Sequence, residues 1–171
     1  MFNTKLLSIT ISITLIFLSA CATQQLTEEQ KTISIVKEAK GSKDELFDAT
    51  KIWIAETFNS AKAVIEFADK EKGTIIGNGT SKYPCTEMCF GSYKWSLHYS
   101  MRVDFKDDRY KVTFTNLELS WPASYSNGVL TKAYRGAVAS QGDYEAIKTH
   151  LLGLADNLDN SIHSESKSSD W

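Results

Sequence analysis

Lys94-Trp95-Ser96-Leu97-His98-Tyr99-Ser100-Met101-Arg102-Val103-Asp104-Phe105 is the stretch that decides the fold of this 171-residue chain. Every second residue from Trp95 onward is apolar or aromatic, and the residues between them are polar. A period of two that is held this long indicates a β-strand with one buried face and one face in water. The rest of the domain must therefore supply a cover for one side of a sheet.

The pattern changes phase in the segment that follows. After a turn at 106–109, alternate residues from Tyr110 to Phe114 continue the buried face. The apolar positions then return one residue out of step, from Leu117 to Trp121. Because a shift of one residue turns side chains to the opposite face, we expect a β-bulge or a bend near Asn116.

Two helices are predicted, one on each side of the main strands in sequence. Ser42 and Glu45 have the spacing of a capping box, and an apolar stripe at helical spacing follows them to about Phe58. Asp143 is expected to cap a second helix, whose apolar stripe runs to Leu158. The predicted strands are 32–36, 63–68, 74–79, 94–105 and 109–121.

This order predicts an α+β fold, β-α-β-β-β-β-α, in which two helices pack on one face of an antiparallel sheet. Residues 122–142, rich in Ser, Gly and Ala, are predicted to form a long loop of the kind that is often functional. Residues 161–171 are polar and are predicted to be a disordered tail.

The N-terminus is typical of an export signal, with Lys5, an apolar run over 6–18 and small residues at a cleavage site. Leu18-Ser19-Ala20-Cys21 resembles the lipobox of bacterial lipoproteins, in which the Cys is acylated and becomes the first mature residue. We therefore expect a signal peptide over 1–20, attachment to the lipid bilayer through acylated Cys21, a tether over 21–31 and a folded domain over 32–160. An uncleaved anchor and a plain secretory signal are the alternatives.

Ala22 follows the predicted acylation site. It stands where Asp would favour retention in the inner membrane of enteric bacteria. We expect the protein in the bacterial cell envelope, on the periplasmic face of the outer membrane.

Three stretches resemble a known bacterial family: residues 42–47 (SKDELF), Trp53 with Phe58, and residues 65–77 (IEFADKEKGTIIG). The family has no known function and a fold similar to that of the TATA-binding protein (TBP-like), and its members are mostly exported or lipoproteins. The resemblance implies the same strand–helix–four-strand–helix order and carries no catalytic residue. The fold name implies no DNA binding, because one fold hosts unrelated functions.

Cys85 and Cys89 form a close pair in a chain that we expect to be exported. Disulfides form and persist outside the cytosol, so a Cys85–Cys89 disulfide is predicted. Two free thiols, or half of a metal site with His98 as the nearby histidine, are the alternatives.

Composition and motifs favour a binding protein over an enzyme or a nucleic-acid partner. The chain has 19 Lys and Arg against 21 Asp and Glu, and no basic stripe. We find no catalytic motif, cofactor site or metal site. The leading hypothesis is a non-catalytic binding or accessory module for an envelope protein or glycan. The alternatives are an unrecognised hydrolase that uses His98, and a purely structural lipoprotein.

Two groups of residues are candidate contacts for that partner. His98 and Arg102 share the polar strand face about 13 Å apart, which suits only a large anionic ligand. Trp121, Tyr125 and Tyr134 surround the predicted loop, where exposed aromatic rings could stack on sugar rings or dock a partner.

Overall fold

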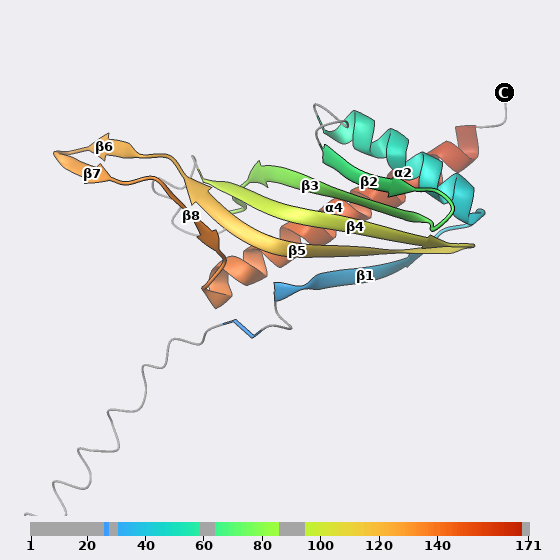
Figure 1. Ribbon diagram of the computed structural model, residues 1–171, viewed down its shortest axis with the longest axis horizontal. Coiled ribbons are helices and arrows are strands. Elements are labelled where there is room, and N and C mark those ends of the chain that lie inside the picture. The colour runs from blue at the N-terminus through green and yellow to red at the C-terminus, as the bar shows by residue number, and fades with distance from the viewer. Residues whose placement is uncertain (1–25, 28–30, 59–63, 86–94, 169–171) are drawn as a thin grey trace, which may run out of the picture.

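In the described part of the chain, the strands form one six-stranded antiparallel sheet and one two-stranded hairpin. The computed structural model describes residues 26–27, 31–58, 64–85 and 95–168. The elements are β1 (Ile33–Glu38), α2 (Lys43–Thr57), β2 (Ile65–Asp69), β3 (Thr74–Lys82), β4 (Ser96–Lys106), β5 (Arg109–Trp121), β6 (Ser124–Ser126), β7 (Val129–Thr131), β8 (Tyr134–Ala137) and α4 (Gln141–Ser168). The sheet order is β1-β5-β4-β3-β2, and β8 also pairs with β5 (Figure 1).

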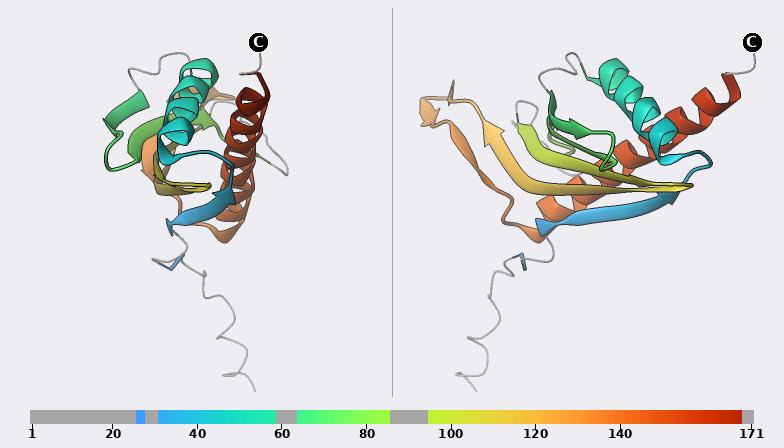
Figure 2. Two further views of the ribbon diagram at one scale, coloured as in Figure 1. Left: turned by 90° about the vertical axis from the view of Figure 1, so that its right-hand side faces the viewer. Right: turned by 45° about the vertical axis from the view of Figure 1, so that its right-hand side comes forward.

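The alternation predicted for β4 is confirmed and places the core. Its odd-numbered residues from Leu97 to Phe105 are buried, and the residues between them are partly or fully exposed. Both helices lie on the buried side of the sheet, as the two views of Figure 2 show. Ile54 of α2 and Leu151 of α4 are fully buried against this side. The predicted α+β fold with two helices on one face is therefore confirmed.

The predicted irregularity in β5 is a β-bulge. His98 pairs with Glu118 and Ser100 pairs with Thr115, so β5 uses one more residue than β4 between these pairs. Asn116 takes up the difference with a φ of 53°. Asn tolerates this left-handed conformation better than most residues. The bulge keeps the apolar residues on both of its sides facing the helices.

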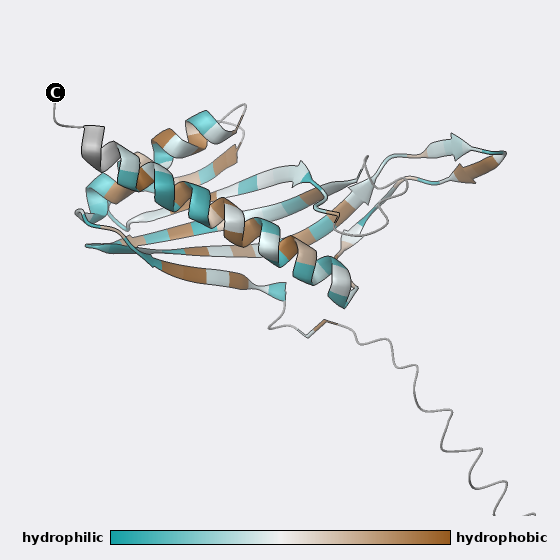
Figure 3. Ribbon diagram, turned by 180° about the vertical axis from the view of Figure 1, so that it is seen from behind, coloured by the Kyte–Doolittle hydropathy of each residue, from teal (hydrophilic) through white to brown (hydrophobic). Residues whose placement is uncertain are grey.

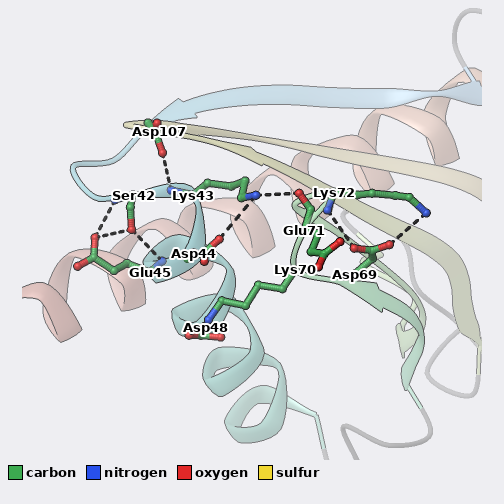
Figure 4. Close-up of polar contacts among 10 residues, drawn as sticks. All are labelled: Ser42, Lys43, Asp44, Glu45, Asp48, Asp69, Lys70, Glu71, Lys72 and Asp107. Atoms are coloured by element: carbon green, nitrogen blue, oxygen red, sulfur yellow. Dashed lines mark hydrogen bonds and ion pairs between the residues drawn. The ribbon is translucent and has the colours of Figure 1, made fainter.

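The start of α2 is held by its own cap and by two hairpin turns (Figure 4). Ser42 and Glu45 form the predicted capping box. The backbone amide of Lys43 donates to the Asp107 carboxylate at 2.8 Å, and its ammonium donates to the Glu71 carbonyl at 2.7 Å. These contacts join the helix to the β4–β5 and β2–β3 turns, so they fix how α2 lies across the sheet.

The predicted C-terminal tail is wrong in most of its length, because α4 continues to Ser168. Ile162 lies four residues after Leu158 and is only 4% exposed. The helical stripe thus extends by one further turn, within a segment whose polar composition suggested disorder. Burial of this one side chain favours helix over tail.

Two glycine substitutions test the close packing of the sheet. A Cβ at Gly77 would overlap the backbone carbonyl of Val64, whereas Gly153 on α4 faces open space. Gly77→Ala is expected to lower the free energy of unfolding by about 1–3 kcal/mol, because backbone must move. Gly153→Ala is expected to raise it by about 1 kcal/mol through helix propensity. Urea unfolding measures both changes, and effects of the same sign would contradict the packing described here.

Candidate partner-binding surface

We define the polar face as the side of the sheet away from the helices. Its side chains form hydrogen bonds with one another across neighbouring strands. His98 lies near its centre, with Nδ1 3.0 Å from the Thr80 hydroxyl and Nε2 2.8 Å from the Ser120 hydroxyl. Partial burial lowers the pKa of His98, and the Arg135 cation lowers it further, while Glu118 opposes both. The neutral imidazole is therefore favoured near pH 7.

His98 and Arg102 do not form one binding site. Arg102 is held by Asp104, with its Nε 2.7 Å from one carboxylate oxygen and its Nη2 2.8 Å from the other. His98 is held by hydroxyl groups on the neighbouring strands. The two side chains thus bond to different partners, His98 to hydroxyl groups and Arg102 to a carboxylate. The geometry therefore does not support the predicted joint contact with one anion.

The Ser120–His98 contact has the distance of a nucleophile and its base, but its surroundings differ from those of a hydrolase. The second imidazole nitrogen meets the Thr80 hydroxyl instead of a carboxylate. The backbone amides of paired strands lie in the plane of the sheet and bond neighbouring strands, so they are not aimed at an oxyanion above it. Within the described ranges, no group of three metal-ligating side chains occurs.

An aromatic row lies on the opposite, helix-facing side, at the end of the sheet where β5 finishes. It consists of Tyr83, Trp95, Trp121 and Tyr134. Trp121 stacks on Trp95 at 4.6 Å between ring centroids and on Tyr134 at 4.3 Å, and Tyr83 tilts against Trp95 at 5.4 Å. Neighbouring rings therefore cover both ring faces of Trp121, and neither face is open to stack on a sugar.

The row is fixed to the start of α4. The Tyr83 hydroxyl donates a hydrogen bond to Asp143. Burial, together with this carboxylate, raises the pKa of Tyr83 to about 12. Asp143 is not the cap that the sequence suggested. It lies in the first turn of α4, and its amide donates at 3.1 Å to the hydroxyl of Ser140, the residue before the helix.

Residues 122–142 do not form the predicted loop, because three short strands lie within them. β6 and β7 make a hairpin that projects beyond the sheet, which we call the arm (residues 122–133) (Figures 1 and 2). Asn127 and Gly128 form its turn with φ angles of 50° and 79°. This pair is a strong hairpin signal that the sequence interpretation missed.

The arm exposes apolar side chains. Tyr125 is 74% exposed, Val129 65% and Leu130 62%. Tyr125 pairs with Leu130 across the hairpin, so the two side chains share one face. Figure 3 shows the apolar character of β7 at the end of the molecule. Of the three aromatic residues predicted as one cluster, Tyr125 belongs to the arm, while Trp121 and Tyr134 belong to the aromatic row.

A groove of about 470 Å³ opens beside the bulge. Its lining includes Leu26, Leu117 of β5 and Ala137 of β8. Leu26 also packs against the hydrophobic core, so the domain begins earlier than the predicted boundary at residue 32. Cys21 and Cys89 lie outside the described residues, and acylation and the Cys85–Cys89 disulfide therefore stay predictions.

The architecture defines an α+β domain of TBP-like fold. The chain belongs to the DUF4468 family, described as a domain of unknown function with TBP-like fold, whose model matches residues 30–120. No curated protein matches the chain. Among the described residues, no helix is both long and apolar enough to cross a membrane.

Two solved structures are similar to the chain. A TBP-like protein from Parabacteroides distasonis has a TM-score of 0.60 and 18% identity, covering 81% of this chain and 96% of that one. A DUF4468 family protein from Bacteroides ovatus has a TM-score of 0.52 and 16% identity, covering 82% and 88%. These likenesses define the fold, and the family match ends before the arm begins.

Tyr83→Phe tests the link between the aromatic row and α4. The variant loses a hydrogen bond to a carboxylate, and we expect it to be about 1.5 kcal/mol less stable than the parent at pH 7. An unfolded tyrosine loses its proton near pH 10, whereas native Tyr83 keeps it to about 12. The unfolded state then binds fewer protons, so the stabilisation by Tyr83 is lost as the pH rises from 10 to 12.

Urea unfolding at pH 7, 10 and 12 measures this difference. Tyr125→Phe is the matched control, because it removes a hydroxyl from the exposed arm. A gap between the parent and Tyr83→Phe that stays constant up to pH 12 would contradict the assigned role of the hydroxyl.

Proposed function

We propose that the protein is a lipid-anchored, non-catalytic binding module of the bacterial envelope that docks onto another envelope component through its arm. The lipobox-like sequence ending at Cys21 supports the anchor, and Ala22 supports the periplasmic face of the outer membrane. The observation that carries the docking role is the exposure of Tyr125, Val129 and Leu130 on one projecting hairpin.

Burial in the domain does not explain these apolar side chains. A two-stranded hairpin is marginal in water unless its side chains pack against something else. The two strands of the arm are three residues each, and their pairing leaves Tyr125 and Leu130 exposed on one face. A contact that covers this face would remove apolar surface from water, which favours a binding role.

The polar face supports such a role less well. The Ser100 hydroxyl donates to Asn78 at 2.8 Å and accepts from Asn116 at 3.1 Å. Together with the contacts of His98 and Arg102, these bonds give the polar side chains of the face hydrogen-bond partners within the domain. A partner would have to break them to make its own, so the polar face offers little net gain.

A hydrolase that uses His98 is the second candidate, because Ser120 lies within hydrogen-bond distance of its imidazole. The missing carboxylate and the in-plane amides described above argue against it. Replacing His98 by Gln and assaying ester and amide substrates tests this alternative. Hydrolysis by the parent that the variant lacks would overturn the non-catalytic role.

The anchor is tested by Cys21→Ala. We expect the variant to lose acylation and to appear in the soluble envelope fraction, because the described domain offers no membrane-crossing helix. Mass spectrometry of the mature parent should find Cys21 as the acylated first residue. Unchanged membrane attachment of the variant, or a Cys21 without acyl mass, would contradict the proposal.

Docking through the arm is tested by photo-crosslinking in intact cells. A photoreactive residue in place of Leu130 should form adducts, whereas the same residue in place of Thr113 on the polar face should not. Mass spectrometry then identifies the adduct as protein, glycan or lipid. Equal labelling at both positions, or adducts at neither, would favour a purely structural lipoprotein.

A further inference from the structure

We infer that the partner of the arm is the lipid bilayer itself, into whose anionic surface the end of the arm inserts, with Tyr125 and Leu130 on one face of the hairpin and Val129 on the other. This inference rests on the proposed function, because the acyl group on Cys21 is what brings the bilayer within reach. It assigns the arm as a second, non-covalent membrane contact. Three features of the chain support it: the short segment before the domain, the side chains of the arm, and the distribution of charge.

The chain before the domain is short. Leu26 packs against the core and lines the groove beside the bulge. Five residue steps separate Cys21 from Leu26, which span at most about 17 Å when extended. The bilayer surface must therefore lie within this distance of Leu26, closer than a tether running to residue 31 would allow.

The arm lies at the same end of the molecule. Ala137, the last residue of β8, lines the groove together with Leu26, and Tyr134, the first residue of β8, directly follows the arm. One four-residue strand thus joins the groove to the base of the arm. Figure 1 shows the arm projecting past the end of the sheet where β5 finishes, and residues 26–27 below the start of β1 on the same half of the molecule. A surface close to Leu26 is consequently also close to the base of the arm.

The side chains of the arm suit the boundary between lipid and water. Leu130 and Val129 are aliphatic, and Tyr125 has an apolar ring with a polar tip. Tyrosine is enriched at the level of the lipid headgroups for this reason. Ser and Thr at the ends of the two short strands can remain in the polar headgroup layer, so shallow insertion leaves no buried charge.

Charge distinguishes this end of the molecule from the other. Residues 119–142 contain no Asp or Glu, although the whole chain has a net charge of −2. Of their two cations, Arg135 pairs with Glu118, and Lys132 of the arm is exposed. Near the far end of the sheet, carboxylates and ammonium groups pair with one another, as Asp48 does with Lys70 and Asp69 with Lys72 (Figure 4). An anionic surface would therefore attract the arm through Lys132, because the arm carries no carboxylate to oppose this attraction.

The experiment uses the acylated protein, purified in detergent and reconstituted on vesicles of phosphatidylethanolamine and phosphatidylglycerol at 3:1. An environment-sensitive fluorescent amino acid replaces Ser126 on the arm, or Lys106 at the opposite end of the sheet as the position control. A spin-labelled lipid serves as quencher. We expect a blue shift and quenching at position 126, and neither at position 106.

A pair of double variants shows whether the apolar side chains cause the insertion. Val129→Ser with Leu130→Ser should lose most of the blue shift and the quenching at position 126. Val36→Ser with Ile52→Ser is the matched control, because Val36 and Ile52 are 60% and 46% exposed elsewhere on the surface. Unchanged thermal unfolding of both variants would show that the domain remains folded.

The outcomes separate the inference from the proposed function. A probe at position 126 that stays in water on vesicles carrying the protein overturns the inference and leaves the anchored module intact. Shielding of the probe that depends on protein concentration without lipid indicates a second copy as the occupant, and also overturns it. Acylated protein that does not remain on vesicles overturns the anchor on which both depend.

Discussion

One extra residue in β5 is the constraint on which the rest of the structure depends. The bulge at Asn116 lets β5 present apolar side chains to the helices on both of its halves. β1 pairs with β5 up to Phe114, and β8 pairs with it from Glu118. The bulge therefore also separates two edge partners, and the groove that receives Leu26 opens between them. Without it, one half of β5 would turn its apolar residues into water.

The two faces of the sheet are stabilised by different interactions, apolar packing on one face and side-chain hydrogen bonds on the other. On one face, helices and the aromatic row remove apolar groups from water, and Tyr83 fastens the row to α4. On the other face, hydroxyls and amides bond one another around His98. Both faces are thus stable without a partner. Only at the arm does the described structure leave several large apolar side chains together in water.

Much of the fold could be predicted because its signals are local. The alternation in β4, the capping box at Ser42 and the change of phase before Leu117 each follow from residues that are neighbours in sequence. The arm was missed although Asn127-Gly128 marks it, because strands of three residues are too short to show a period. The last turn of α4 depends on one buried side chain in a polar segment.

The candidate site was harder to predict, because its contacts depend on the register between strands. Trp95 and Trp121 lie far apart in sequence and become neighbours only when β4 and β5 pair. In the same way, the hydroxyls that hold His98 come from two other strands. The spacing of His98 and Arg102 along one strand could not reveal either partner. Residue type alone singled out the histidine and the aromatic side chains as candidates. The register between paired strands determines what these side chains contact.

The family match and the proposed docking surface concern different parts of this chain. The family match covers residues 30–120, which contain the bulged sheet and α2 but neither the arm nor α4. The matched part supplies the support for the arm, since its core packs against the helices and its polar face is hydrogen-bonded across the strands. The arm follows these residues in the chain and contains no Asp or Glu. The surface that we propose for docking therefore lies outside the residues that define the family, on a projecting hairpin of the kind of connecting segment that often carries function.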